Sequence, residues 1–566
     1  MFEGVSQQEG TMGVDWAGPV AAVTRRDVLR LVSAGVAANV LSGCRHDWPP
    51  PGECDLDYPV IDVHCHFFNA ADVPVEGLVR YLALREGTPG KIPTPVVNAL
   101  AVVLVVALAD VAPEAKDELA VLQKRARPLS EAELQRRKDK QLYRAVEALI
   151  ALAKKERSTS EFVQGFFGEE PAYDALLDQL ADRANLPRSF LDGIGGVSPT
   201  DIDAIVKAAK THDIFGVYIR FVQLMQDYRM DLAENYLRIY ASRCSLSVIT
   251  PSILDFEKSI PGKASPQCDQ IDVMDEIQRI VARERGIRMH SFVGFDPKRE
   301  VCDPGSSLEN VEYAIMCKGF IGVKLYPPMG FQATGNAKPI EAALKKLYNW
   351  CCKHDVPIMA HTENSLGAHC GFGNFASPVH WRKLLNDRHY RDLRINLAHF
   401  GGFDESRRKG EPTGILVNCE RDKFSGPPSW EKIIGKTIRD DHRANLYADL
   451  SYLSELVSTT SAGLHYDIRK RLNAWLNAYD PTARHLMFGT DWSMMSRERN
   501  YNNYVARMVD GLARAGVGEE LRQNIFWRNA SRFLGLDRPG PTRERIAAYC
   551  KTHELGTDWL SEIVIA

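Results

Sequence analysis

Short apolar runs alternate with helical stretches along most of the chain. Segments whose apolar positions recur at the helical period, such as 340–352 and 501–515, separate runs rich in Val, Ile, Leu and Ala. The runs lie at residues 58–66, 246–254, 287–294, 320–326, 356–361, 395–399, 445–449 and 486–491. Strands that alternate with helices pair in parallel. Eight such strands predict an α/β fold of the (β/α)8 TIM barrel type.

The interval 71–241 interrupts this alternation. Its apolar run at 96–109 is too short for a membrane-spanning helix of ordinary length. Ser130 and Glu133 have the spacing of a capping box, which predicts the start of a long charged helix that runs through Lys155. We interpret the interval as a long, mainly helical insertion after the first strand, folded as a cap over the barrel mouth. The alternative is that its apolar run contacts a membrane.

The amino-terminal segment has the pattern of an export signal. Arg25 and Arg26 precede a mildly apolar stretch that ends at Leu41, and Leu-Ser-Gly-Cys follows, ending at Cys44. The segment resembles a twin-arginine lipoprotein signal at 1–44, with Cys44 as the lipidated residue, followed by a linker at 45–57. This predicts an exported bacterial protein, periplasmic or membrane-anchored through Cys44. A surface helix on a cytoplasmic protein is the alternative.

Composition narrows the class of partner. The 566 residues are 45% hydrophobic and 25% charged, which is ordinary for a globular protein. A formal net charge of −3 argues against nucleic acid as a partner. The twelve cysteines form no C-x-x-C pair, so a zinc ribbon is not indicated. A small-molecule substrate is the expected partner, and the sequence does not indicate an oligomeric state.

Polar side chains stand where the predicted strands end. His64 and His66 are two residues apart, so they point to the same face of a strand. The full set comprises His64, His66, Lys324, His361, His399 and Asp491. The carboxyl ends of barrel strands meet at one mouth, so these side chains are expected to converge there. Imidazole and carboxylate ligands suit Zn²⁺ or a similar ion. Any one of these residues alone would more often be a buried histidine or a capping aspartate.

These motifs together resemble the amidohydrolase superfamily. They are Asp62-Val-His64-Cys-His66, Gly322-Val-Lys324-Leu325, Met359-Ala-His361, Ala398-His399-Phe-Gly-Gly402, Phe488-Gly-Thr-Asp491-Trp492, and Asn529-Ala530 with Phe533-Leu-Gly-Leu536. The last resembles the closing helix of the family-2 branch, which includes aminocarboxymuconate-semialdehyde decarboxylase and related decarboxylases and hydrolases. The resemblance implies a metal-dependent barrel domain at 58–540 and a C-terminal tail at 541–566.

The resemblance also implies roles for the strand-end residues. His64, His66, His361 and Asp491 would hold one divalent ion, with Zn as the first expectation and Mn, Fe or Co as alternatives. Asp491 would also orient and deprotonate the attacking water. His399 would act as a general acid or base, or bind a second metal.

Lys324 has two interpretations under the same resemblance. In binuclear members a strand-4 lysine is carbamylated and bridges two metals. In the mononuclear branch, which we favour, Lys324 would pair with a substrate carboxylate or form a salt bridge.

Three functions fit this site. The first is a metal-dependent hydrolase that activates water against an amide, ester or lactone-like bond. The second is a non-oxidative decarboxylase of an unsaturated or aromatic acid. The third is a lipid-anchored binding protein without catalysis. Four further residues are weaker candidates. Asp449 is a candidate to orient a ligand histidine, Arg220 and Arg299 are weaker candidates for an acidic substrate, and His290 is expected to be structural.

Overall fold

The computed structural model describes residues 56–75, 112–124, 224–241, 245–364, 367–369, 371–403, 429–453, 462–498 and 501–565. The predicted signal at 1–44 and almost all of the linker at 45–57 lie outside these residues. The apolar run at 96–109 and the charged helix predicted from Ser130 also lie outside them.

Each of the eight apolar runs predicted as strands contributes a strand, and all the strand pairs are parallel. The strands are β1 (Val60–Cys65), β2 (Leu246–Pro251), β3 (Arg288–Met289), β4 (Phe292–Gly294), β5 (Gly322–Leu325), β6 (Ile358–His361), β7 (Ile395–Ala398), β8 (Leu446–Asp449) and β9 (Leu486–Met487). They form a sheet of order β1-β2-β3 and a sheet that runs from β4 to β9 in sequence order. The prediction of a parallel α/β fold is therefore confirmed.

The run predicted as one strand at 287–294 is divided into β3 and β4. The break falls at His290 and Ser291, where the His290 side chain and the Ser291 amide bond outside the strand ladder. His290 Nδ1 lies 2.9 Å from the carbonyl of Gly319, and the Ser291 amide donates to Gln278 Oε1 at 2.8 Å. These two bonds divert the backbone where the apolar pattern alone predicts a continuous strand.

Backbone hydrogen bonds also join the two sheets at their borders. The amide of Val63 in β1 donates to the carbonyl of Phe488, just after β9, at 3.2 Å. At the other border the amide of Ile253 donates to the carbonyl of Phe292 in β4 at 3.0 Å. The first and last strands of the chain therefore lie side by side, which brings their carboxyl ends to the same place.

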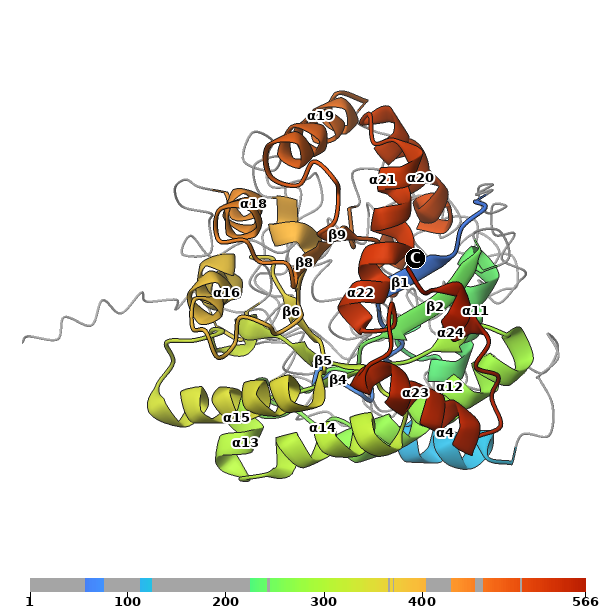
Figure 1. Ribbon diagram of the computed structural model, residues 1–566. Helices are drawn as coiled ribbons and strands as arrows, with labels where there is room; N and C mark the ends of the chain where they lie inside the picture. Colours follow the sequence, from blue (N-terminus) through green and yellow to red (C-terminus); the bar gives the residue numbers. More distant parts are fainter. Residues whose placement is uncertain are drawn as a thin grey trace, which may run out of the picture.

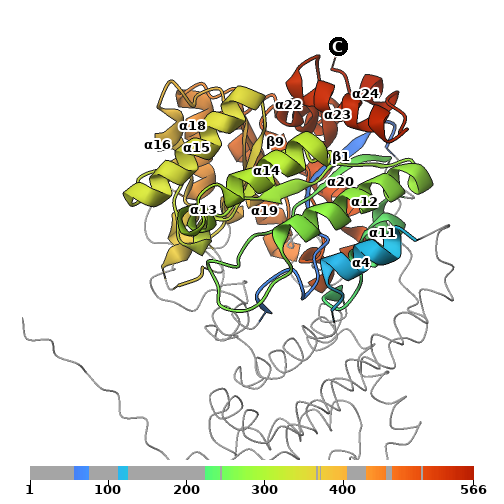
Figure 2. The same cartoon turned by 90° about the horizontal axis from the view of Figure 1, so that it is seen from below.

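Helices surround the strands on the outside (Figures 1 and 2). They are α12 (Gln267–Arg285), α13 (Pro297–Cys302), α14 (Ser306–Cys317), α15 (Lys338–His354), α16 (Pro378–Leu385), α18 (Trp430–Asp440), α19 (Ala462–Tyr479), α20 (Tyr504–Arg514), α21 (Glu519–Gln523), α22 (Asn529–Leu534), α23 (Pro541–Thr552) and α24 (Trp559–Glu562). In α15, Leu344, Leu347 and Cys351 recur at helical spacing and are buried. Pro339 in its first turn is suited to a helix start.

Two helices within the interval 71–241 fall among the described residues, α4 (Ala115–Leu122) and α11 (Arg229–Tyr240). Arg229 joins them to the loop after β1 through a buried ion cluster. Its Nη1 donates to Glu118 Oε2 in α4 at 2.8 Å, and its Nε donates to Asp72 Oδ2 at 2.8 Å. The described parts of the predicted helical insertion are thus held against the strands, and the rest of it lies outside the described residues. Among those residues, no helix has the length and apolarity needed to cross a membrane.

The segment predicted as a C-terminal tail, 541–566, contains α23 and α24. Tyr549, Trp559 and Leu560 are buried in the same core as the strands. Trp559 stacks on the ring of His290, with 5.7 Å between ring centroids. The segment therefore covers the strands as part of the domain, because its apolar residues recur on one side of two short helices.

His290 should make the fold acid-sensitive. Burial lowers its pKa from 6.5 to about 4, whereas the Gly319 carbonyl opposes that shift. The folded chain keeps His290 neutral while the unfolded chain takes up a proton below about pH 6.5, so stability falls as the pH drops from 6.5 towards 4. Over this pH range the free energy of unfolding falls by about 3 kcal/mol because of His290.

We expect His290→Gln to remove this contribution. The variant should be less stable than the wild type at pH 7. This difference in unfolding free energy should be about 2 kcal/mol smaller at pH 5, as measured by denaturant titration. Other buried carboxyl groups titrate in both proteins, so only the difference between them reports on His290. An equal deficit at both pH values would contradict the assignment.

Candidate metal centre

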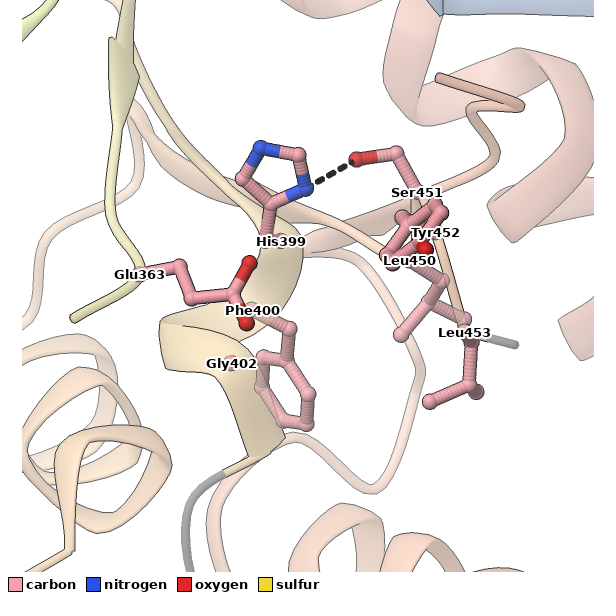
Figure 3. A pocket seen from close by; sticks show the side chains of 8 residues that line it. All are labelled: Glu363, His399, Phe400, Gly402, Leu450, Ser451, Tyr452 and Leu453. Atoms are coloured by element: carbon pink, nitrogen blue, oxygen red, sulfur yellow. Dashed lines mark hydrogen bonds between the residues drawn. The ribbon is translucent and has the colours of Figure 1, made fainter. Parts of the chain in front are cut away.

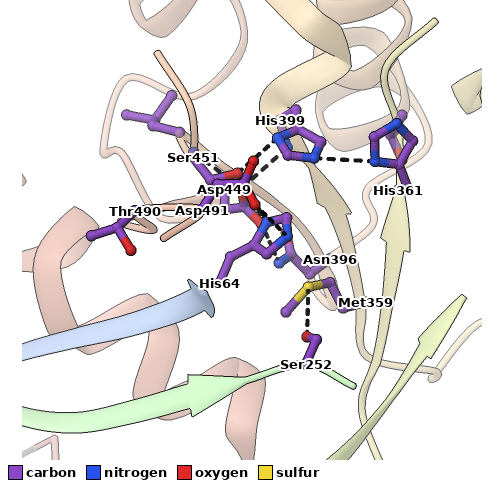
Figure 4. A network of polar contacts seen from close by, with 12 residues as sticks. His64, Ser252, Met359, His361, Asn396, His399, Asp449, Ser451, Thr490 and Asp491 are labelled. Atoms are coloured by element: carbon purple, nitrogen blue, oxygen red, sulfur yellow. Dashed lines mark hydrogen bonds and ion pairs between the residues drawn. The ribbon is translucent and has the colours of Figure 1, made fainter. Parts of the chain in front are cut away.

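The strand-end residues singled out by the sequence come together at the carboxyl ends of the strands (Figure 4). His64 is the last residue but one of β1 and His66 follows that strand directly, His361 ends β6, and His399 follows β7 directly. Asp491 lies four residues beyond the end of β9. Lys324 projects from β5 into the same cluster and touches His64. The prediction that these side chains converge is therefore correct.

His64, His66 and Asp491 form a first group of potential metal ligands. Asp491 Oδ1 lies 3.5 Å from His66 Nε2 and 3.8 Å from His64 Nε2. The Nδ1 nitrogens of both rings bond to residues outside this group. His66 Nδ1 donates to the carbonyl of Ser252 at 2.9 Å, and His64 Nδ1 faces Asp449 Oδ2 at 3.2 Å. With Nδ1 protonated on both rings, both Nε2 lone pairs face the group.

The charges of this group suit a cation. Burial, together with the nearby Lys324, lowers the pKa of both His64 and His66, which keeps both imidazoles neutral at pH 7. Burial alone would raise the pKa of Asp449, but the neighbouring His64 and His399 outweigh it and hold the pKa well below its usual range. Neutral imidazoles and ionised carboxylates are the protonation states that bind a divalent ion.

The side chain of Lys324 is in contact with this group. Lys324 is buried, and its Nζ lies 2.9 Å from His64 Nε2 and 3.1 Å from Met359 Sδ. Burial lowers the pKa of Lys324 to about 8, against the opposing pull of Asp449 and Asp491. The carboxylates of Asp449 and Asp491 are therefore what favours a cation at this place, and the donor set fits a divalent ion there.

His361 belongs to a second group, with Glu363 and His399. The ligand atoms of these three lie within 4.8 Å of one another, and His361 Nδ1 is 3.1 Å from His399 Nε2. Among the described residues, no group of ligand atoms this close joins His361 to His64, His66 and Asp491, whereas a third group joins His64, His399 and Asp449. Sequence analysis missed Glu363, although its spacing from His361 is the same i, i+2 spacing that singled out His64 and His66.

A pocket opens beside the second group (Figure 3). It has an empty volume of about 270 Å³ including open solvent, and Glu363 and His399 form part of its wall. The remaining wall is largely apolar, with Phe400, Leu450 and Leu453. His399 is thus the histidine of the site that this pocket reaches.

Asp449 and Ser451 connect the two groups. Asp449 accepts from Asn396 Nδ2 at 2.7 Å and from the amide of His399 at 3.1 Å, in addition to facing His64. Ser451 Oγ lies 2.9 Å from both His64 Nδ1 and His399 Nδ1. The geometry agrees with the expectation that Asp449 orients a histidine. Nothing in the sequence singles out Ser451, because its role depends on two histidines distant in the chain.

Asp62 forms hydrogen bonds that stabilise the backbone next to the first group of ligands. It accepts from Tyr236 Oη and from Thr490 Oγ1, both at 2.6 Å, and from the amide of His64 at 3.0 Å. Burial raises the pKa of Asp62 to about 6, and these hydrogen bonds oppose the rise. Asp491, next to Thr490, has a positive φ of 52°, a conformation that surrounding contacts must hold in place.

The arginines considered for an acidic substrate do not join the site. Arg299 is ion-paired with Asp255 at 2.6 Å and with Glu257 at 2.7 Å. Arg220 lies outside the described residues.

Comparisons with known proteins agree with the sequence motifs. The model of one family, Amidohydrolase, matches residues 61–536. No match was found among curated proteins. Among solved structures, the chain is similar to an amidohydrolase from Burkholderia multivorans with bound zinc (14% identity, 57% of this chain, 91% of that chain, TM-score 0.36).

Two decarboxylase structures are also similar to the chain. One is 5-carboxyvanillate decarboxylase from Sphingomonas paucimobilis (12% identity, 64% of this chain, 96% of that chain, TM-score 0.32). The other is dihydroxybenzoic acid decarboxylase from Polaromonas sp. JS666 with bound manganese and an inhibitor (16%, 62%, 94%, TM-score 0.34).

Proposed function

Because the chain belongs to the amidohydrolase family, whose model matches residues 61–536, we propose that it is a metal-dependent decarboxylase. Its substrate would be a small unsaturated or aromatic carboxylic acid, which loses carbon dioxide without oxidation. The observation that carries this proposal is the buried ammonium of Lys324 next to the first ligand group. The likeness to solved decarboxylases, at TM-scores of 0.32 and 0.34, adds no weight to the choice.

Lys324 favours an anionic substrate for an electrostatic reason. Its Nζ lies 2.9 Å from His64 Nε2, so a cation on that nitrogen and the ammonium would be neighbours in a buried place. Two unit charges about 4 Å apart interact by about 4 kcal/mol at an effective dielectric constant of 20, and a divalent ion doubles this. A carboxylate between them would turn that repulsion into attraction on both sides.

The reaction requires one proton for each molecule of carbon dioxide. The bond between the carboxylate and the substrate carbon breaks, its electron pair stays on that carbon, and a proton takes the place of the carboxylate. A divalent ion held by His64, His66 and Asp491 would supply a Lewis acid that polarises the substrate. Asp491 belongs to the first ligand group and His399 to the second, and these two residues would deliver the proton.

Hydrolysis of an amide, ester or lactone-like bond, the first expectation from the sequence, remains the second candidate. The observation in its favour is Asp491, whose carboxylate faces both ligand histidines and could accept a proton from water. Zn is the first expectation for the ion in either case, with Mn, Fe or Co as alternatives.

We also propose that the parallel strands close into a (β/α)8 barrel. The hydrogen bond between Val63 and Phe488, which links the first strand to the last, supports this arrangement.

The test is carbon dioxide release by the metal-loaded protein, screened over unsaturated and aromatic acids beside esters, lactones and amides. We expect carbon dioxide from an acid, and Lys324→Met should lower kcat/KM at least about a hundredfold because a buried charge loses its partner. The metal content of this variant should stay unchanged.

Three other outcomes would contradict parts of the proposal. Turnover of esters, lactones or amides without carbon dioxide would establish the hydrolase instead. Loss of metal from Lys324→Met would assign the lysine to metal bridging. A folded wild-type protein that binds no metal and turns nothing over would favour the binding protein.

A further inference from the structure

We propose that Ser451 is a positioning residue that fixes the tautomer of His399. Its hydroxyl donates a hydrogen bond to His399 Nδ1, which keeps the ring hydrogen of His399 on Nε2. Ser451 Oγ lies 2.9 Å from the Nδ1 atoms of both His64 and His399 (Figure 4). A hydroxyl has one hydrogen, so it can donate to only one of the two rings. The direction of these hydrogen bonds therefore decides what His399 can do.

The ring hydrogen of His64 lies on Nδ1. His64 Nε2 accepts from the ammonium of Lys324 at 2.9 Å, and the same lone pair would hold a metal ion. A neutral imidazole carries one N–H group and one lone pair, so Nδ1 of His64 is the donor. Ser451 Oγ is thus an acceptor towards His64, and its own hydrogen must point elsewhere.

The carboxylate of Asp449 is the other acceptor near this hydroxyl, and it is already engaged. A carboxylate offers about four lone-pair sites. N–H donors that reach Asp449 are His64 Nδ1 at 3.2 Å, Asn396 Nδ2 at 2.7 Å, and the amides of His399 and Ser451, both at 3.1 Å. Among the described residues, the acceptor left for the Ser451 hydroxyl is therefore His399 Nδ1.

The position of Ser451 is fixed by close packing. Ser451 is 4% exposed, and Gly489 lies behind it. A Cβ at residue 489 would lie 2.9 Å from the Cβ of His64 and 3.2 Å from the Cβ of Ser451. Glycine at this position lets both side chains approach the same place. The hydroxyl is therefore held between the two rings by the backbone around it.

This tautomer determines what His399 presents to the rest of the site. Its Nε2 lies 3.1 Å from His361 Nδ1, which can accept the ring hydrogen. His399 also forms part of the pocket wall, so a substrate group that enters there can take over the same hydrogen bond (Figure 3). A nitrogen that carries a hydrogen has no lone pair for an ion. The arrangement thus favours His399 as a hydrogen-bond donor over His399 as a ligand of a second metal.

The role of this donor in the reaction rests on the proposed function. As carbon dioxide leaves, the electron pair of the broken bond spreads over the unsaturated or aromatic part of the substrate. An oxygen on that part gains negative charge, and the Nε2–H of His399 would donate to it. His399 keeps its hydrogen in this step, so the proton that replaces the carboxylate would come from Asp491. Because the donor acts mainly in the transition state, its loss should lower kcat more than it changes KM.

The direct test is ¹⁵N nuclear magnetic resonance of the full chain, labelled at histidine and loaded with Zn²⁺, at about pH 8, where an ordinary imidazole is neutral. Ring nitrogens with and without a hydrogen give separate signals, and His399→Gln identifies those of His399. We expect the hydrogen on Nε2 in the wild type and a mixture of both tautomers in Ser451→Ala. A hydroxyl turned towards Asp449 would leave the hydrogen on Nδ1. That result, a hydrogen on both nitrogens, or a tautomer unchanged in Ser451→Ala would overturn the proposal.

Kinetics test the role in the reaction, with the acid that releases carbon dioxide in the screen. Ser451→Ala should lower kcat about tenfold to a hundredfold, with KM within about twofold and metal content unchanged. Ser451→Thr keeps the hydroxyl and should recover most of the rate. Ser493→Ala is the matched control and should equal the wild type. Ser493 is 1% exposed, and its Oγ has no hydrogen-bond partner among the described residues.

Two kinetic results would overturn the role of Ser451 in the reaction. One is a loss of rate in Ser451→Ala that lies in KM alone. The other is a Ser451→Thr protein that keeps the hydrogen of His399 on Nε2 but loses as much rate as Ser451→Ala. Absence of carbon dioxide from every acid would contradict the proposed function instead, and the resonance measurement would still decide the tautomer of His399.

Discussion

Replacing His64 with asparagine is expected to empty the first metal site and to lower kcat/KM for the substrate acid by about a thousandfold or more. In the proposed site the Nε2 of His64 would be one of three ligand atoms, and its loss would remove a Lewis acid that contributes several kcal/mol to the transition state. About 4 kcal/mol corresponds to a factor of a thousand. Asparagine can still donate to Asp449, which should preserve the hydrogen-bonded framework behind the site.

The experiment combines metal content, carbon dioxide release and circular dichroism on the same sample. His389→Asn is the control, because His389 is exposed and bonds to Asn349 far from the ligand groups. It should behave like the wild type in all three measurements. If His64→Asn keeps its full metal content and rate, the assignment of the first site is wrong.

The positions of the ligands could be predicted from the sequence because two simple rules act together. Apolar runs mark buried strands, and the carboxyl ends of parallel strands meet at one place. A histidine that ends such a run, as His361 does in β6, must therefore lie near the others. The same rules say nothing of which ligands share an ion. That depends on ring orientation, which is set by partners such as Ser252 and Ser451.

Residues that act from loops, or through partners distant in the sequence, could not be predicted from the sequence. Glu363 follows a strand by two residues, and only the fold of that loop brings its carboxylate to His399. Asp62 is conspicuous in the motif, yet its partner Tyr236 lies beyond an interval of 174 residues. The division between β3 and β4 likewise depends on Gln278, a polar residue of α12 that no periodicity connects with a strand.

The ion cluster around Arg229 also joins residues that are distant in the sequence, so it could not be predicted. Breaking it should have the largest effect on stability. Arg229 is 1% exposed, Glu118 is 0% and Asp72 is 3%, so three charges are buried together. Burial alone would lower the pKa of Arg229, but Asp72 and Glu118 outweigh it and raise the pKa above its usual value. Burial also raises the pKa of Glu118, whereas Arg229 lowers it. The guanidinium is thus the counter-charge that both buried carboxylates contact.

Arg229→Met is therefore expected to lower the free energy of unfolding by about 3–5 kcal/mol, because two buried carboxylates lose their counter-charge. Adding Glu118→Gln should restore part of this loss, since it removes one of the two unpaired charges, and its amide oxygen can still accept from one of the two amides that Glu118 binds. Arg514→Met removes an exposed helical pair with Asp510 and should cost less than about 1 kcal/mol. Denaturant titration measures all three. A double variant no more stable than Arg229→Met would mean that lost packing of the arginine side chain causes the effect, rather than unpaired charge.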